Sequence, residues 1–164
     1  MPDPQSPIRQ TDDQARTLAR RLIREARFGA LAVLDPGTGA PFVSRIALGP
    51  GPDGGLWSLI SGLAFHYRAL AQDPRAALLL GEPGPKGDPL THPRLSLTLR
   101  AQFLAPDDPA RGAVRARWLA DHPKSKLYID LPDFRFIAFT LIAGALNEGF
   151  ARAYQLSPDD MGHL

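Results

Sequence analysis

The sequence contains no cysteine. Disulfide bonds, thiolate catalysis, iron–sulfur clusters and zinc sites with cysteine ligands are therefore excluded. No apolar run approaches the roughly 20 residues of a membrane span, and the longest run, residues 136–146, is interrupted by Thr140 and Gly144. The N-terminal residues also lack the apolar segment of a signal peptide. We therefore expect a cytoplasmic protein.

Common catalytic and nucleotide-binding motifs are missing as well. There is no G-x-S-x-G elbow, no P-loop and no G-x-G-x-x-G after a strand. The histidines are scattered and do not have the spacing of metal ligands: His66, His92, His122 and His163. Neither a metal site nor a catalytic constellation is predicted from the residues alone.

The overall composition is that of one globular domain. The chain has 164 residues, 44% hydrophobic and 22% charged, with a formal net charge of +2. This charge is too small for a protein that coats nucleic acid. The 17 prolines and 15 glycines predict many tight turns between short elements.

Helical periodicity is clearest over residues 11–27. Apolar residues recur at i, i+3, i+4 and i+7 from Ala15 to Ala26, and Thr11 with Gln14 has the spacing of a capping box. We interpret residues 1–10 as a flexible lead, residues 11–154 as the folded domain and residues 155–164 as a C-terminal tail. Shorter helices are predicted at 63–72, with Leu63, Tyr67 and Leu70 buried, and at 109–122.

Strand patterns occupy most of the remaining domain. The predicted strands are 28–34, 41–48, 55–60, 75–81, 94–104 and 134–143, followed by a short piece ending near residue 150. The first three, separated by Gly/Pro turns, read as an antiparallel meander. Leu95, Leu97 and Leu99 alternate with polar residues, which predicts a strand with one wet face. Six or so short strands with interposed helices indicate a mainly β barrel or sandwich.

Basic and hydroxyl side chains gather where predicted elements meet. Ser44 and Arg45 lie within an apolar strand, and Ser61 precedes a helix whose N-terminus suits phosphate. His66 and Arg68 follow on that helix, and Arg94 opens a later strand. Together these groups could hold a dianionic phosphate. Each also has a plainer interpretation: a solvated arginine, an N-cap serine or a surface histidine.

The order of these segments resembles the pyridoxamine 5′-phosphate oxidase-like FMN-binding split-barrel family, in particular its haem-utilisation branch. The matching pieces are FGALAVL, PFVSRIAL, the block from LWSLISGLAFHYRAL through DPRAALLLG to GDPLTHPRL, and NEGFARAY. They extend over roughly residues 19–154. The resemblance implies a split β-barrel of six to seven antiparallel strands with flanking helices. It also implies FMN held between the two subunits of a homodimer.

The resemblance also suggests which residues hold the cofactor. They are Ser44, Arg45 and Ile46 along the flavin, Ser61, His66 and Arg68 at its phosphate, Arg94 as a further contact, and the segment from Asn147 to Phe150. That segment resembles the family's G-G-F-G but reads N-E-G-F, and Glu148 adds a negative charge.

Three functional hypotheses follow. The first is an FMN-dependent oxidoreductase acting on a small molecule, for which no catalytic residue is assigned; the sequence lacks the arginine/histidine signature of a pyridoxine phosphate site. The alternative is haem binding or degradation in iron utilisation, with His66, His92 or His163 as iron ligand. A third, a nucleic-acid or membrane-surface module using the arginine face of the first helix, is disfavoured. That helix also carries Asp12, Asp13 and Glu25 and lacks an aromatic anchor.

Overall fold

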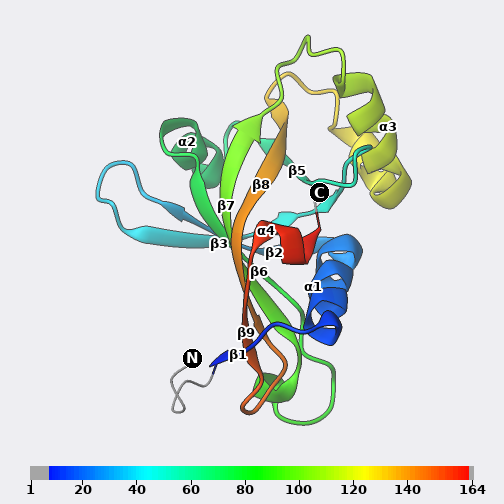
Figure 1. The fold of residues 1–164 in the computed structure, drawn as a ribbon. Coiled ribbons are helices and arrows are strands. Elements are labelled where there is room, and N and C mark those ends of the chain that lie inside the picture. The colour runs from blue at the N-terminus through cyan, green and yellow to red at the C-terminus, as the bar shows by residue number, and fades with distance from the viewer. Residues whose placement is uncertain (1–7, 163–164) are drawn as a thin grey trace.

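The computed structural model describes residues 8–162, which form a mainly β structure with four α-helices (Figure 1). The strands are β1 (Ile8–Arg9), β2 (Phe28–Leu34), β3 (Pro41–Ala47), β4 (Gly49–Pro50), β5 (Leu56–Ser61), β6 (Arg75–Leu80), β7 (Arg94–Phe103), β8 (Phe134–Asn147) and β9 (Ala153–Leu156). The helices are α1 (Asp13–Glu25), α2 (Phe65–Gln72), α3 (Arg111–Asp121) and α4 (Pro158–Met161), with two short 3-10 turns, η1 (Pro89–Thr91) and η2 (Pro123–Leu127). None of the helices in this part of the chain is long and apolar enough to cross a membrane.

One open, mixed sheet contains all of these strands. Its main path is β1-β9-β8-β7-β6-β2-β3, and only the β1–β9 pair is parallel. This arrangement confirms the predicted mainly β fold with flanking helices, and seven of the strands have four or more residues. The β2–β3 hairpin projects away from the body, so β3 is an edge strand (Figure 1).

The predicted three-strand meander is wrong at its last strand. β5 does not pair with β3 but lies antiparallel to the first half of β8, from Leu56 opposite Phe139 to Ser61 opposite Phe134. The physical reason is burial: the first five residues of β5 are all buried. A strand that is buried on both faces is covered by other elements on both sides, whereas the last strand of an exposed meander would have one face in solvent.

A β-bulge divides β8 into two halves that pair with different strands. Thr98 pairs with Ala143 but Leu99 pairs with Leu141, so Ile142 is an extra residue. An extra residue of this kind bends the strand and increases its twist. The first half of β8 therefore pairs with β5, while its end turns to pair with β9.

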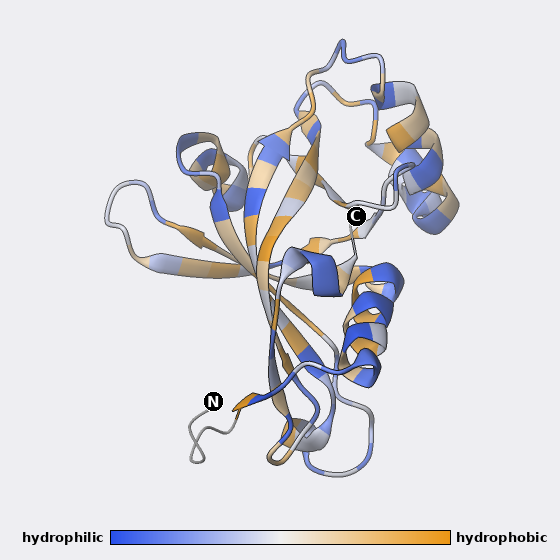
Figure 2. Ribbon diagram, viewed as in Figure 1, coloured by the Kyte–Doolittle hydropathy of each residue, from blue (hydrophilic) through white to orange (hydrophobic). Residues whose placement is uncertain are grey.

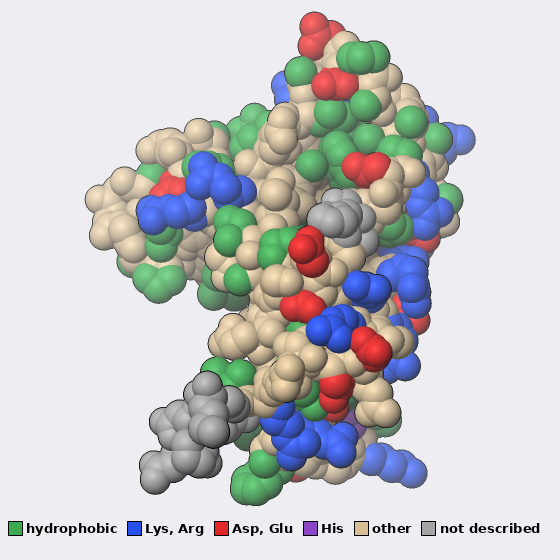
Figure 3. All heavy atoms as spheres, in the orientation of Figure 1, with side chains coloured by type: hydrophobic (Ala, Val, Ile, Leu, Met, Phe, Trp, Pro, Cys, Tyr) green, Lys and Arg blue, Asp and Glu red, His purple; other side chains and the backbone are tan. Residues whose placement is uncertain are grey.

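The core comprises two apolar clusters. The larger lies inside the sheet under α1, whose Ala15, Ala19 and Ile23 are buried, and the smaller joins β5 and β8 to α3 through Trp118. Figure 2 shows α1 with its hydrophobic side toward the strands, and Figure 3 shows Lys and Arg side chains gathered along its outer side. The N-cap of α1 is Asp12 rather than Thr11, because the Asp12 carboxylate accepts from the Ala15 N–H at 2.8 Å.

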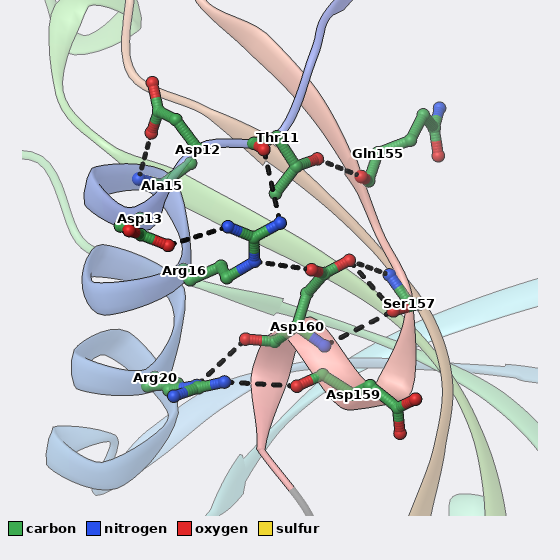
Figure 4. Close-up of polar contacts among 10 residues, drawn as sticks. All are labelled: Thr11, Asp12, Asp13, Ala15, Arg16, Arg20, Gln155, Ser157, Asp159 and Asp160. Carbon is green, nitrogen blue, oxygen red and sulfur yellow. Dashed lines mark hydrogen bonds and ion pairs between the residues drawn. The ribbon is translucent and has the colours of Figure 1, made fainter.

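Residues at both ends of the described chain pack against the rest of the domain. β1 pairs with β9, and Leu156 and Met161 are buried in the larger cluster. Figure 4 shows how α4 is held: the Arg16 guanidinium donates to the Asp160 carboxylate at 2.7 Å, and Arg20 donates to two backbone carbonyls of α4. Residues 1–7 and 163–164 lie outside the described residues.

Candidate functional site

A contact between β3 and α2 forms the centre of the candidate site. Ser44 Oγ lies 3.1 Å from His66 Nδ1, and both residues are half-buried. Burial lowers the pKa of His66 below its usual value, so the imidazole is neutral at pH 7. The Nε2 atom of His66 makes no hydrogen bond within residues 8–162. The pair therefore presents one free ring nitrogen in a fixed orientation.

Aromatic side chains flank this pair. The rings of Phe42 and Phe65 lie with their centroids 4.4 Å apart, and the Arg68 guanidinium carbon is 6.0 Å from the Phe65 ring centroid. Ile46, predicted to lie along a flavin, is on the same face of β3, but its side chain is buried in the core. Only the backbone of Ile46 is left to meet a ligand.

Ser61 lies at the end of β5, just before α2. Its hydroxyl donates to the Asp133 carboxylate at 2.9 Å and accepts from the Leu63 N–H at 3.2 Å. α2 has no side-chain cap, so its first N–H groups remain open to an anion. The Asp133 carboxylate nevertheless places a negative charge beside the hydroxyl that was predicted to meet phosphate. Leu63, predicted to be buried, is 84% exposed.

Arg45 points away from the Ser44–His66 pair. Successive side chains of a strand alternate between faces, and the Arg45 guanidinium carbon lies 5.6 Å from the Phe28 ring centroid on the outer face. We call this outer side the open face. It is defined by the cross-strand row Arg45, Ala30, Leu79, Ser96 and Ala145 and by the next row, Val43, Ala32, Ala77, Thr98 and Ala143. All ten residues are exposed or half-exposed.

Arg94 and Asn147 lie at the far end of the sheet and oppose each other on β7 and β8. The Arg94 guanidinium donates to the Leu90 carbonyl at 2.9 Å, and Asn147 Oδ1 accepts from the Gly149 N–H at 2.9 Å. Ser44 lies three strands away from Arg94, because the sheet runs from β3 through β2 and β6 to β7, and Arg94 is also three residues before the residue of β7 that is level with Ser44. Strand spacing and the rise per residue give a separation of roughly 17 Å along the sheet. A single protomer therefore does not bring the predicted residues into one site.

The two other histidines among the described residues, His92 and His122, make hydrogen bonds away from this site. His92 uses both ring nitrogens within its own loop, accepting from the Gly84 N–H at 3.2 Å and contacting the Lys86 carbonyl at 2.9 Å. His122 contacts the Leu48 carbonyl at 2.7 Å and stacks on Trp118. His163 lies outside the described residues. Within residues 8–162, no three His, Asp or Glu side chains form a metal-binding group.

Sequence reasoning did not single out Asp133, Phe42 or Phe65. Phe42 lies two residues before Ser44, and Phe65 lies immediately before His66. Once Ser44 of β3 is known to contact His66 of α2, this spacing predicts that the two rings lie near each other. Asp133 reaches Ser61 across 72 positions of sequence, and no local pattern indicates it. A separate cavity of about 480 Å³ lies among β5, β7, β8 and α4, and no predicted site residue lines it.

Comparison with known proteins shows similarity to haem proteins. The chain is 30% identical over 99 residues to the chloroplastic heme oxygenase HOZ of Arabidopsis thaliana, which covers 60% of this chain and 29% of the relative. A heme binding protein from Mycobacterium smegmatis is 26% identical, with a TM-score of 0.78 over 94% of this chain and 61% of its own. A protein of unknown function from Agrobacterium tumefaciens is 35% identical, with a TM-score of 0.77 over 90% of this chain and 60% of its own. This chain thus spans less than a third of the curated relative and about three fifths of these two structures.

The fold also matches a protein related to general stress protein 26 from Clostridium acetobutylicum, described as of the pyridoxinephosphate oxidase family. The two are 16% identical, with a TM-score of 0.68 over 92% of this chain and 99% of the other. No protein-family model matches the sequence. The bent β8, the open sheet and these similarities together show that the chain has the fold of the pyridoxamine 5′-phosphate oxidase-like split-barrel proteins, and the chain resembles the haem-utilisation branch of that family.

Proposed function

We propose that this chain binds a planar, negatively charged cofactor between two copies of itself, and that the cofactor is haem. The observation that carries this proposal is the Ser44–His66 pair. A ligand histidine must be neutral at the nitrogen that meets the metal, and its other nitrogen is usually held by a hydrogen bond. His66 meets both conditions, because burial lowers its pKa and Ser44 contacts Nδ1 at 3.1 Å.

The position of the remaining residues supports a shared site. Arg94 and Asn147 lie roughly 17 Å along the sheet from Ser44, too far to contact the same cofactor edge in one protomer. A two-fold axis brings one end of each copy against the other end of its partner. The edge strand β3 and the open face expose Val43 and Leu79, at 62% and 44%, which a second copy would cover.

These residues divide the tasks of holding haem. His66 Nε2 is the iron ligand and Ser44 fixes the ring orientation. Arg94 lies on the open face, where it would pair with a propionate of a haem shared with the second copy, since guanidinium–carboxylate pairs are among the strong hydrogen bonds. Arg45 points away from His66 of its own protomer, so Arg45 would reach a propionate only across the interface. Bound haem supplies iron-centred electron-transfer and oxygen chemistry. The haem-related names of the Arabidopsis and Mycobacterium relatives support this assignment.

FMN is the second candidate, and the open N-terminus of α2 favours it. Uncapped N–H groups beside Ser61 and Arg68 suit a phosphate, and bound FMN would make the chain an FMN-dependent oxidoreductase with a small-molecule substrate. The Asp133 carboxylate opposes this assignment, because it lies against the Ser61 hydroxyl and repels a dianion. We therefore rank FMN after haem.

Titration of the purified chain with haemin and with FMN, each followed by visible absorption, tests the proposal. We expect haemin to give a sharpened, shifted Soret band that saturates at one cofactor per protomer. His66→Gln should shift the band and weaken binding, whereas His92→Gln, the matched control, should change neither. A Soret band that is identical in the wild type and in His66→Gln would remove His66 as the ligand. A flavin spectrum without haemin binding would establish the FMN alternative.

A further inference from the structure

A cavity of about 480 Å³ lies beside β5, and its volume is in the range of small-molecule sites. It is bordered by the turn between β4 and β5, by the loop that precedes α3 and by both ends of α4. Trp57 lines it from β5, four residues before Ser61, which is roughly 13 Å along the strand. The cavity is therefore separate from the Ser44–His66 pair, and its side chains have no part in the proposed haem site.

The charged side chains that line this cavity are two carboxylates, Asp53 and Asp108. Each uses one oxygen within its own turn. Asp53 Oδ1 accepts from the Gly55 N–H at 3.0 Å, and Asp108 Oδ1 accepts from the Ala110 N–H at 2.8 Å. Neither Oδ2 atom accepts a hydrogen bond from residues 8–162. Two carboxylate oxygens are therefore left for hydrogen-bond donors of a ligand.

Neighbouring arginines do not neutralise these carboxylates. Among residues 8–162, no lysine, arginine or histidine lines the cavity. Arg100 on β7 lies close enough to Asp73 to interact with it electrostatically, and Arg111 contacts the Asp130 carboxylate at 3.6 Å. Beside α4, Arg20 donates to two backbone carbonyls of that helix. A cavity lined by charges of one sign concentrates ligands of the opposite sign, so this one favours a cation.

Trp57 adds an unused hydrogen-bond donor to the cavity. The residue is only 8% exposed, and its indole N–H makes no hydrogen bond within the described chain. A Cβ at Gly51 would overlap Trp57 Nε1 and would lie 2.8 Å from Asp53 Oδ1, so the indole N–H and this carboxylate lie near each other. A donor beside an acceptor suits a hydroxyl group, which accepts one hydrogen bond and donates another.

We propose that this cavity binds a small phenolic amine, a ligand with an ammonium group, an aromatic ring and a hydroxyl group. The hydroxyl accepts from the Trp57 indole N–H and donates to the Asp53 carboxylate beside it. The ammonium group pairs with Asp108, as charge-assisted hydrogen bonds to carboxylates are strong. The ring packs on the apolar part of the lining, which includes Phe103 and Phe139. This site takes a cation, whereas the proposed cofactor site takes an anionic ligand.

The chain has two tryptophans, so NMR of their indole N–H groups tests the proposal directly. The Trp118 indole N–H donates to Ser125 Oγ at 3.1 Å inside the smaller core cluster, and its signal is the internal reference. Trp57→Phe assigns the two signals of the isotope-labelled protein. Titration with tyramine should move the Trp57 signal to saturation and leave the Trp118 signal in place. Movement of neither signal, or of both equally, would overturn the proposal.

Matched ligands test the charge and the hydroxyl in the same experiment. The acid para-hydroxyphenylacetate carries a carboxylate in place of the ammonium group and should not bind. Phenethylamine lacks the hydroxyl, leaves the Trp57 donor without an acceptor, and should bind about tenfold more weakly than tyramine. Equal binding of tyramine and the acid would overturn the selection of a cation.

Matched variants test the role of Asp108. Asp108→Asn keeps an acceptor for the Ala110 N–H but removes the charge, and it should weaken tyramine binding about tenfold. Asp107→Asn is the control, because Asp107 is exposed one position away and does not line the cavity; it should bind tyramine as the wild type does. The same spectra show whether both variants are folded. Wild-type affinity for tyramine in a folded Asp108→Asn variant would overturn the inference.

Discussion

Met161 fastens the C-terminal end of the domain to the sheet, and its replacement by alanine measures that attachment. Its side chain is fully buried in the larger core cluster. Met161→Ala removes three heavy atoms from that position. Buried methionine-to-alanine changes cost roughly 2–5 kcal/mol. α4 is short and partly free to move into the space, so we expect about 2–3 kcal/mol of lost unfolding free energy.

A second substitution, at Gly144, tests the same contact from the opposite side. A Cβ added at Gly144 would lie 2.7 Å from Met161 Sδ and 3.3 Å from Leu156 Cβ. Gly144→Ala therefore overpacks the same contact and should destabilise the wild type by about 1–3 kcal/mol. In a Met161→Ala background the added methyl group fills the vacated space. We expect the double variant to be more stable than the sum of the two single effects by about 1 kcal/mol.

Equilibrium urea unfolding of the four proteins, followed by circular dichroism, gives these free energies. The m-values should remain equal, since the compactness of the domain is unchanged. A loss below about 0.5 kcal/mol for Met161→Ala, which is typical of surface positions, would refute the inference that α4 belongs to the core. Additive single effects would show that the two side chains do not share one contact.

Three further outcomes are expected. Hydrogen bonds from the Ser157 N–H, Arg16 and the Ser157 hydroxyl lower the pKa of Asp160 to about 2. The ionised Asp160 carboxylate therefore stabilises the folded state fully above the pKa of an unfolded aspartate, near 4, and this stabilisation is lost as the pH falls toward 2. The difference in urea midpoint between the wild type and Asp160→Asn should therefore narrow between pH 6 and pH 3, and a constant difference would contradict this. Asp12→Ala should lower the free energy of unfolding by about 1 kcal/mol, as loss of an N-cap does, and Thr11→Ala should lower it by less. A larger loss of thermal stability in Thr11→Ala than in Asp12→Ala would place the cap at Thr11. Val43→Arg on the exposed edge of β3 should lower the sedimentation coefficient to that of a monomer, and an unchanged coefficient would remove this edge from the interface.

Local patterns predicted the elements well where one face of a strand is wet. Leu95, Leu97 and Leu99 alternate with polar residues, and β7 buries these leucines. β5 carries no such alternation, because five of its six residues are buried, and its pairing with β8 depends on tertiary packing. The N-cap of α1 was missed by one residue, since Thr11 and Asp12 are both good caps and only the hydrogen bond from the Ala15 N–H to Asp12 distinguishes them.

The candidate site was predicted as a set of residues but not as a geometry. Strand alternation alone places Ser44 and Arg45 on opposite faces, a signal present in the sequence. The Ser61–Asp133 bond could not be predicted, since it joins residues 72 positions apart through the β5–β8 pairing. The distance between Ser44 and Arg94 follows from the order of the strands in the sheet. The predicted meander gave a different order, so it did not predict this distance.

The sharing of one cofactor between two copies is tested most directly by haemin titration under sedimentation, with absorbance read at the Soret band. We expect haem absorbance to travel with a dimer and to reach two cofactors per dimer at saturation. Haem that travels with a folded monomer at full occupancy would contradict a site built from two copies, and no co-sedimenting absorbance with either haemin or FMN would contradict cofactor binding itself.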